Sequence, residues 1–168
     1  MAELETAIRI AVTAHAGQTD KSGAPYITHP LRLMSMVESD EAKCAAVLHD
    51  VVEDTPVTLA DLRREGLSDA VLEAVACLTH AKEQPYVDYV IRCKANPIAR
   101  QVKIADLIDN SRPERAMLRP AMIDRDLARI ARYLLSHRFL SNGITEAEYR
   151  SLMQSHGDVE AHPFRESP

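Results

Sequence analysis

Aromatic side chains and cysteines are both scarce in this sequence. It contains no Trp, two Phe and five Tyr among 168 residues, which disfavours an all-β sandwich, because strands are enriched in aromatic residues. Its three cysteines, Cys44, Cys77 and Cys93, lie far apart and form no CxxC pair. Their odd number excludes a complete disulfide framework. We therefore expect reduced cysteines in the protein core.

The chain also lacks long apolar runs and an excess of positive charge. No apolar segment approaches the roughly 20 residues of a membrane-spanning helix, and the acidic start MAELE is unlike a signal peptide. We therefore predict a cytoplasmic protein with no membrane partner. The net charge of −5 argues against a nucleic-acid polymer as partner. It leaves room for a small phosphorylated ligand, which needs only a few local cations.

The composition is typical of a single globular domain. Of the 168 residues, 46% are hydrophobic and 27% are charged, which suffices for one sizeable core. The sequence shows no internal repeat, low-complexity run or interdomain linker. We therefore predict one domain over residues 1–154, followed by a polar tail over residues 155–168. The sequence does not indicate an oligomeric state.

Apolar residues recur with helical spacing along almost the whole chain, which predicts an all-α, compact multi-helix fold. Capping residues, prolines and glycines mark where the helices begin and end. Residues 17–29 are predicted to form a loop, and Pro30, the first residue of the next helix, is expected to hold His29 in an extended conformation. Ser39 or Asp40 is expected to cap the third helix. The expected helices cover about residues 3–16, 30–38, 40–55, 58–64, 68–78, 85–94, 97–109 and 124–140, with a last one starting at residue 145.

The segment AAVLHDVVEDT, residues 45–55, combines a nearly continuous apolar run with four charged or titratable side chains. On a continuous helix, His49 lies above Glu53 and Asp50 above Asp54, because residues four apart share a face. The apolar surroundings indicate a buried helix, where three carboxylates do not remain ionised unless cations or hydrogen bonds compensate them. The simplest physical explanation is a metal ion in a water-lined pocket.

Two further side chains extend this set. In the helix that begins at Pro97, Asp106 lies four residues after the apolar Val102 and therefore points toward the interior. His29 lies at the start of another helix, before Pro30. Two imidazoles and two carboxylates from three segments suit a borderline-hard divalent ion, such as Mn²⁺, Fe²⁺ or Zn²⁺, better than a thiolate-binding metal.

Glu53 and Asp54 follow the histidine and aspartate ligands on the same segment. A bound divalent ion can activate water and polarise a phosphoryl oxygen, so these carboxylates would orient or deprotonate the water and protonate the leaving group. Taken singly, His49 can be a satisfied core histidine, and Asp106 can pair with Lys103 one turn earlier. The Glu53–Asp54 pair can be a solvent-exposed helix end, although carboxylates are unfavourable at a helix C-terminus. The combination favours the metal site.

Several sequence motifs occur in order within about residues 7–110. They are AHAGQ at residues 14–18, SGAPYITHPL at 22–31, HDVVEDT at 49–55, VKIAD at 102–106, and Asn110. Together they resemble the HD superfamily of metal-dependent phosphohydrolases. More narrowly, they resemble the alarmone hydrolase domain of RelA/SpoT-type proteins and its stand-alone small relatives. As a set, motifs at these spacings are specific, whereas a single His-Asp dipeptide is weak.

The resemblance implies an all-helical HD fold with one Mn²⁺ as cofactor, Zn²⁺ and Fe²⁺ being other candidates. It implies that Glu53 and Asp54 form the catalytic pair, and that the reaction removes pyrophosphate from the 3′ position of ppGpp or pppGpp. No synthetase domain fits in this chain, so the expected activity on this small nucleotide is degradative. The residues that match the family's metal ligands are His29, His49, Asp50 and Asp106, and those that match positions lining its nucleotide pocket are Lys21, Lys103 and Asn110.

Two positions depart from the family pattern. Asp20 stands where the family has an arginine that stacks on the guanine base, and a carboxylate makes no such cation–π contact. Leu107 stands where the family often has Arg or Lys, and Arg112 and Arg115 are candidates for replacement phosphate contacts. Two other hypotheses therefore stand beside the alarmone hydrolase. One is a phosphohydrolase for another nucleotide or small phosphoester, and the other is a non-catalytic metal or nucleotide sensor.

Overall fold

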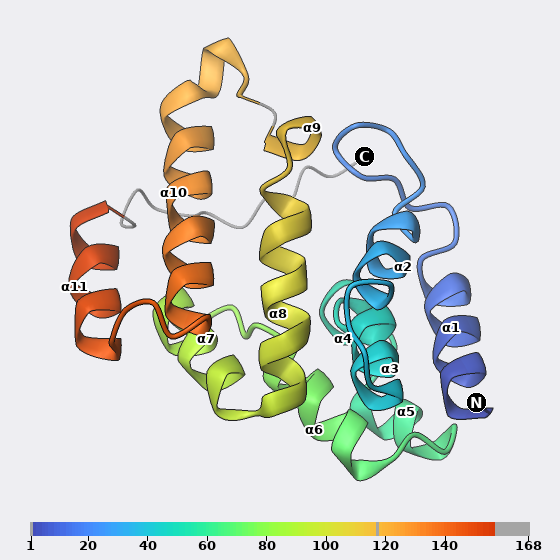
Figure 1. Ribbon diagram of the computed structural model, residues 1–168. Coiled ribbons are helices and arrows are strands. Elements are labelled where there is room, and N and C mark those ends of the chain that lie inside the picture. Colours follow the sequence, from blue (N-terminus) through green and yellow to red (C-terminus); the bar gives the residue numbers. More distant parts are fainter. Residues whose placement is uncertain (1, 117, 157–168) are drawn as a thin grey trace. The chain divides into compact units, whose positions relative to one another are not determined.

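The computed structural model describes residues 2–116 and 118–156, and every regular element in that part of the chain is a helix (Figure 1). The all-α prediction is therefore confirmed. The β pairing among the described residues is limited to an isolated bridge between Thr19 and Pro25. In chain order the elements are α1 (Ala2–Ala14), α2 (Thr28–Met34), α3 (Asp40–Leu48), α4 (Val51–Asp54), α5 (Leu59–Arg64), α6 (Asp69–Leu78), α7 (Tyr86–Ala95), α8 (Pro97–Asn110), α9 (Pro113–Ala116), the 3₁₀ turn η1 (Pro120–Met122), α10 (Ile123–Leu140) and α11 (Glu146–His156).

The chain divides into two compact units, Met1–Asp109 and Asn110–Pro168. Within the described residues, no helix combines the length and apolar character needed to cross a membrane. Helix α11 continues through His156, so the first two residues of the expected tail are helical, and residues 157–168 lie outside the described part of the chain. The single domain over residues 1–154 stays a prediction.

The first unit is built around α3, which packs against α1, α2 and α6 (Figure 1). Every residue from Cys44 to Leu48 is buried, as expected of a central helix that is apolar on nearly all sides. Each fully buried Val or Leu side chain in it contributes roughly 1.5–3 kcal/mol. Cys44 and Cys93 are buried, as expected of core cysteines, whereas Cys77 is partly exposed. Their reduced state stays a prediction.

Local capping signals place the helix starts where the sequence predicts them. The Ser39 hydroxyl accepts the Ala42 N–H at 3.1 Å, and Thr58 and Asp61 form a complete capping box at the start of α5. The Asn96 side chain accepts backbone N–H groups in the first turn of α8. Each such bond satisfies an amide that has no acceptor within the helix, which is worth about 1 kcal/mol. These caps stabilise the starts of α3, α5 and α8, whereas α2, which carries His29, begins without a side-chain cap.

The predicted extended conformation of His29 is wrong. Helix α2 begins at Thr28, so that His29 is its second residue and Pro30 its third. Proline is tolerated in the first helical turn, where its missing N–H has no acceptor in the helix. The Thr28 hydroxyl donates to the Pro25 carbonyl at 2.9 Å and stabilises this early start. His29 is consequently held by a helix and not by a loop.

The predicted continuous helix over residues 40–55 is also wrong, because it is interrupted between α3 and α4. His49 is the C-cap of α3, and Asp50 follows with φ −101° and ψ −7°. Asp50 is the N-cap of α4, and its carbonyl accepts the first hydrogen bond of that helix, from the Asp54 N–H at 2.8 Å. The break lies at His49 and Asp50, two of the four residues expected to bind metal.

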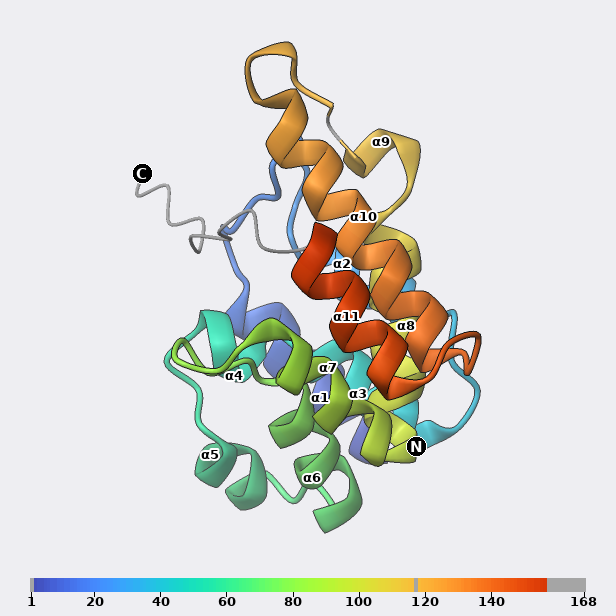
Figure 2. The same ribbon diagram turned by 90° about the vertical axis from the view of Figure 1, so that its left-hand side faces the viewer.

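The second unit contains α10 and α11, which lie side by side in both views (Figures 1 and 2). The rings of Phe139 and Tyr149 stack with centroids 4.6 Å apart, and the Tyr149 hydroxyl shares a 2.8 Å hydrogen bond with Ser136. The sequence predicts both long helices but neither α9 nor η1. These short elements contain too few residues to show a helical period.

Candidate metal and catalytic site

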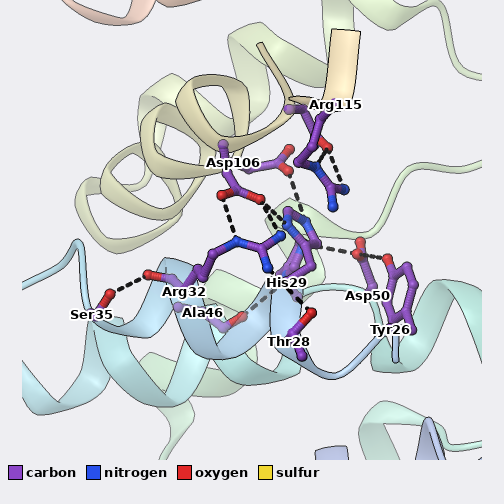
Figure 3. A network of polar contacts seen from close by, with 12 residues as sticks. Tyr26, Thr28, His29, Arg32, Ser35, Ala46, Asp50, Asp106 and Arg115 are labelled. Atoms are coloured by element: carbon purple, nitrogen blue, oxygen red, sulfur yellow. Dashed lines mark hydrogen bonds and ion pairs between the residues drawn. The ribbon is translucent and has the colours of Figure 1, made fainter. Parts of the chain in front are cut away.

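Two histidine rings from different elements face each other in the first unit. His29 is presented by α2 and His49 by the end of α3, and their ring centroids are 5.2 Å apart. One ligand atom each from His29, His49 and Asp50 lie within 4.8 Å of one another. Both histidines are buried, and Figure 3 shows His29 near Asp50 and Asp106. These residues form the centre of the candidate metal site.

Hydrogen bonds at Nδ1 leave the Nε2 atom of each histidine directed at the site. His49 Nδ1–H donates to the Ala46 carbonyl at 2.8 Å, and His29 Nδ1–H donates to Asp109 Oδ2 at 2.7 Å. The buried His49 Nε2 has no hydrogen-bond partner among the described residues, although it lies 2.8 Å from Asp50 Oδ2. A neutral imidazole with a donor fixed at Nδ1 offers its Nε2 lone pair to a metal. The donor set therefore fits a divalent cation.

Asp50 is held from a second direction by Tyr26. The phenol O–H donates a short hydrogen bond to Asp50 Oδ2, and the ring packs between His15 and His29. Burial opposes ionisation of Asp50, but the positive charge that His49 carries when it is protonated lowers the pKa of Asp50 below its usual value. A bound metal would replace that proton at His49 Nε2. Burial and the same carboxylate raise the pKa of Tyr26. The phenol therefore remains a donor, and Asp50 remains an ionised carboxylate that could bind a metal.

Asp106 joins the cluster from α8. Its Oδ1 lies 3.3 Å from His29 Nε2, and its Oδ2 accepts a 2.8 Å hydrogen bond from Lys103 Nζ. Burial opposes ionisation of Asp106 as well, yet the Lys103 ammonium holds its pKa well below the usual range. The structure thus brings all four sequence-predicted metal ligands together. It also contains the Lys103–Asp106 pair that sequence reasoning offered as the simpler explanation of Asp106.

Sequence reasoning missed Asp109 and Arg32. Asp109 is fully buried, and its carboxylate binds the Arg32 guanidinium through two bonds of 2.8 and 2.9 Å. Both residues carry a simple positional signal, because Asp109 lies one helical turn after Asp106 and Arg32 one turn after His29. That signal is common on helices and gave no reason to pair two residues so far apart in sequence.

Glu53 and Asp54 lie on α4 and are both exposed to solvent. Glu53 Oε2 accepts the backbone N–H of His80 at 2.8 Å, which fixes it against the segment between α6 and α7. The surrounding protein and the charge of Asp50 raise the pKa of Asp54 to about 6. Desolvation also raises the pKa of Glu53. Carboxyl groups with raised pKa values beside a candidate metal site are typical of acid–base chemistry.

The three residues expected to bind substrate lie in different surroundings. Lys103 is 8% exposed and directed at Asp106, whereas Lys21 is exposed in the loop before α2. Asn110 ends α8, and its side-chain oxygen accepts a 2.9 Å hydrogen bond from Arg115. Arg115 therefore uses its guanidinium within the second unit, and Arg112 is exposed. A common substrate-binding role for these residues stays a prediction.

Asp20 has a clear structural role in the same loop. Its Oδ1 accepts hydrogen bonds from the Ser22 N–H, the Ser22 hydroxyl and the Ala24 N–H, at 2.9, 2.6 and 3.0 Å. Gly23 has φ +82° at the turn, a conformation that favours glycine. The carboxylate thus closes the turn beside Lys21 where the related family has an arginine.

Among solved structures, one described as a metazoan ortholog of SpoT that hydrolyzes ppGpp matches this chain with a TM-score of 0.65. The two chains are 20% identical, and the match covers 94% of this chain and 97% of the chain in that structure. At this identity the match shows a shared fold.

Curated relatives are similar over parts of the chain. A GTP pyrophosphokinase of Streptomyces coelicolor is 34% identical over 155 residues, which is 84% of this chain and 18% of that protein. A guanosine-3′,5′-bis(diphosphate) 3′-pyrophosphohydrolase of Haemophilus influenzae is 50% identical over 79 residues, 44% of this chain and 12% of that protein. The bifunctional (p)ppGpp synthase/hydrolase SpoT of Escherichia coli is 48% identical over 65 residues, 36% of this chain and 9% of that protein.

These relatives are much longer proteins, since the chain spans less than a fifth of the length of each. The model of the HD domain family matches residues 7–113. That range contains every residue of the candidate metal and catalytic site. The match confirms the resemblance drawn from the sequence motifs, and the chain belongs to the HD domain family.

Proposed function

We propose that this protein is a divalent-metal-dependent phosphohydrolase that removes pyrophosphate from the 3′ position of (p)ppGpp. The observation that supports the proposal is that two histidines lie close to the Asp50 and Asp106 carboxylates. The candidate acid–base pair, Glu53 and Asp54, follows Asp50 closely in the sequence, on α4. The names of the relatives include both synthase and hydrolase activities. We favour hydrolysis, because Glu53 and Asp54 provide the groups that activation of water requires.

The metal ligands would be His29, His49, Asp50 and Asp106. A divalent cation bound there would supply Lewis-acid polarisation of a phosphoryl oxygen and activation of water. We propose Mn²⁺ as that cation, and nitrogen and oxygen ligands are compatible with Zn²⁺ or Fe²⁺ as well. The tautomers of both histidines favour this role, because each donates a hydrogen bond from Nδ1.

Glu53 and Asp54 would move the protons of the reaction. Glu53, fixed by the His80 amide, would accept a proton from the attacking water as the water oxygen bonds to the phosphorus atom that is attached to the 3′ oxygen. The bond between that phosphorus and the 3′ oxygen then breaks. Asp54, whose pKa is raised to about 6, can hold a proton close to neutral pH and give it to the departing 3′ oxygen. The products would be the nucleoside with a free 3′ hydroxyl and pyrophosphate.

The test is a panel of nucleotides assayed with Mn²⁺, with phosphate and pyrophosphate measured separately. The proposal expects pyrophosphate from ppGpp and pppGpp and little turnover of GTP or GDP. Loss of activity on chelation and its return on adding Mn²⁺ would support metal dependence. Negligible turnover of ppGpp beside rapid turnover of another compound would contradict the proposed substrate, and nucleotide binding without turnover under any divalent metal would indicate a sensor.

A phosphohydrolase for another nucleotide or small phosphoester is the second candidate, and Asp20 favours it. Because its carboxylate closes the turn beside Lys21, the loop offers no guanidinium at that position for stacking on a guanine base. The same panel decides between the two candidates, since adenine and guanine nucleotides would then react at similar rates. The cytoplasmic location expected from the acidic N-terminal segment stays a prediction.

A further inference from the structure

We infer that Arg32 and Asp109 are a positioning pair that orients His29 for metal binding. The inference rests on the proposed metal-dependent function and concerns two residues that no motif reasoning assigned. Asp109 Oδ2 accepts the His29 Nδ1–H at 2.7 Å and an Arg32 N–H at 2.9 Å, while its Oδ1 accepts the Arg32 Nε–H at 2.8 Å. Three donors therefore converge on one carboxylate that is 0% exposed.

The orientation of the His29 ring depends on Asp109. The bond from Nδ1–H to Asp109 fixes both the tautomer and the rotation of the ring. Nε2 is then directed at Asp106, 3.3 Å from its Oδ1. Without an acceptor at Nδ1, the ring could rotate or move its proton to Nε2, and either change removes the lone pair from the metal.

The charge of Asp109 is compensated by Arg32. A fully buried carboxylate is costly unless it is paired and hydrogen-bonded. The planar guanidinium of Arg32 matches it with two parallel bonds, and another of its N–H groups donates to the Thr28 hydroxyl at 3.2 Å. Arg32 thus keeps Asp109 ionised and holds it in place.

Two pairs of side chains join helices α2 and α8. His29 and Arg32 are one turn apart on α2, and Asp106 and Asp109 are one turn apart on α8. The two pairs of contacting side chains that connect these helices are His29 with Asp106 and Arg32 with Asp109. The Arg32–Asp109 pair therefore sets the distance between the helices at the His29–Asp106 pair, which contains two of the proposed metal ligands.

The experiment measures the dissociation constant of Mn²⁺ by calorimetry on full-length protein stripped of metal. Removing an outer partner of a metal-bound histidine typically weakens binding by about 10–100-fold. We expect a loss of that size for Asp109→Ala. We expect a smaller loss for Asp109→Asn, because the amide oxygen can still accept the His29 N–H, and for Arg32→Met, which leaves Asp109 in place.

The matched control is Asp126→Ala. Asp126 is another fully buried aspartate paired with arginines, Arg119 and Arg129, but it is not a member of the metal cluster. Its loss should lower thermal stability and leave Mn²⁺ affinity unchanged. A folded Asp109→Ala protein that binds Mn²⁺ as tightly as the unsubstituted protein would overturn the inference. If Asp109→Ala does not fold, unchanged affinity in both Asp109→Asn and Arg32→Met would overturn it.

This readout separates the inference from the proposed function. A protein that binds Mn²⁺ through an Asp109-dependent site but does not cleave ppGpp would contradict only the proposed substrate. A protein that cleaves ppGpp and whose Mn²⁺ affinity is insensitive to Asp109 and Arg32 would contradict only the positioning pair. Absence of Mn²⁺ binding to the unsubstituted protein would overturn both.

Discussion

Lys103 Nζ lies 2.8 Å from Asp106 Oδ2, and both side chains are buried. The ammonium also lies 4.9 Å from the centre of the Tyr89 ring, a cation–π contact that further compensates its charge. Lys103 is thus enclosed by Asp106 and Tyr89 on α8 and α7. Its position shows that it stabilises the ionised form of Asp106, which is one of the proposed metal ligands.

We therefore expect Lys103→Met to destabilise the metal-free protein. Removing one partner of a buried ion pair leaves Asp106 uncompensated, which typically costs about 3–5 kcal/mol. The free energy of unfolding in urea, measured after chelation, checks this. Added Mn²⁺ should reduce the difference in the free energy of unfolding between Lys103→Met and the unsubstituted protein, because the bound cation would again compensate the charge of Asp106.

Lys43→Met is the control for that comparison. Lys43 pairs with Asp40 at 3.6 Å in a largely exposed setting, where an ion pair is worth about 0–1 kcal/mol. If the two variants lose equal stability without metal, the buried Lys103–Asp106 pair does not have the stabilising role assigned to it.

Tyr26→Phe tests the second hydrogen bond to a metal ligand. The substitution keeps the ring between His15 and His29 and removes only the O–H that binds Asp50. Because outer hydrogen bonds orient ligating carboxylates, we expect Mn²⁺ affinity to fall by about tenfold or more. Titration with Mn²⁺ measures the change.

A buried tyrosine in the second unit provides the comparison for Tyr26. Tyr149→Phe removes the hydrogen bond to Ser136 and keeps the stacking on Phe139. It should lower stability without changing Mn²⁺ affinity. Equal Mn²⁺ affinities for Tyr26→Phe and Tyr149→Phe would show that the phenol does not position Asp50.

The parts of the fold that follow from local interactions could be predicted from the sequence. The start of α5 depends on Thr58 and Asp61, three residues apart, and the start of α8 on Asn96 and the two amides that follow it closely. The break at Asp50 could not be predicted, because the side chain is held by Tyr26, 24 residues earlier. Apolar periodicity continues through the break and hides it.

The candidate site shows the same division between local and distant interactions. Its metal ligands lie in short motifs whose residue types already indicate a chemistry, as His49 and Asp50 do. Asp109 carries no such motif, and its partner Arg32 lies 77 residues away. The sequence alone indicates only that Asp20 replaces an arginine, whereas its hydrogen bonds with Ser22 and Ala24 are those of a loop-closing residue.

Glu53→Gln is expected to lower kcat by about 10²-fold or more while Mn²⁺ affinity stays unchanged. The amide oxygen of Gln can still accept the His80 N–H that fixes Glu53, so the substitution removes the base and keeps the local structure. General acid–base groups contribute rate enhancements of this size. Turnover of ppGpp at saturating Mn²⁺ measures the effect.

An exposed glutamate near the same segment serves as the reference. Glu83 precedes α7 and is exposed, so Glu83→Gln should leave kcat at the value of the unsubstituted protein. A Glu53→Gln protein with normal kcat would remove Glu53 from the catalytic pair. Loss of Mn²⁺ binding in that variant would instead indicate that Glu53 is a metal ligand.

The stability that Asp126 contributes should depend on pH in the acid range. Hydrogen bonds from the Arg119 side chain and backbone lower the pKa of Asp126 to about 2, below the value of about 3.9 in an unfolded chain. The folded protein therefore binds this proton less readily than the unfolded protein does. The contribution is fully present above about pH 4 and is lost as the pH falls toward 2.

Asp126→Asn isolates this contribution, because the amide keeps the size of the side chain and does not ionise. The unsubstituted protein should be the more stable of the two at pH 7. The difference in the free energy of unfolding between the two proteins should shrink as the pH is lowered from 4 to 2, because Asp126 then becomes protonated. All other titratable groups are the same in both proteins and do not contribute to this change. A difference that stays constant over this range would mean that the pairing of Asp126 with Arg119 and Arg129 does not stabilise the folded state through its charge.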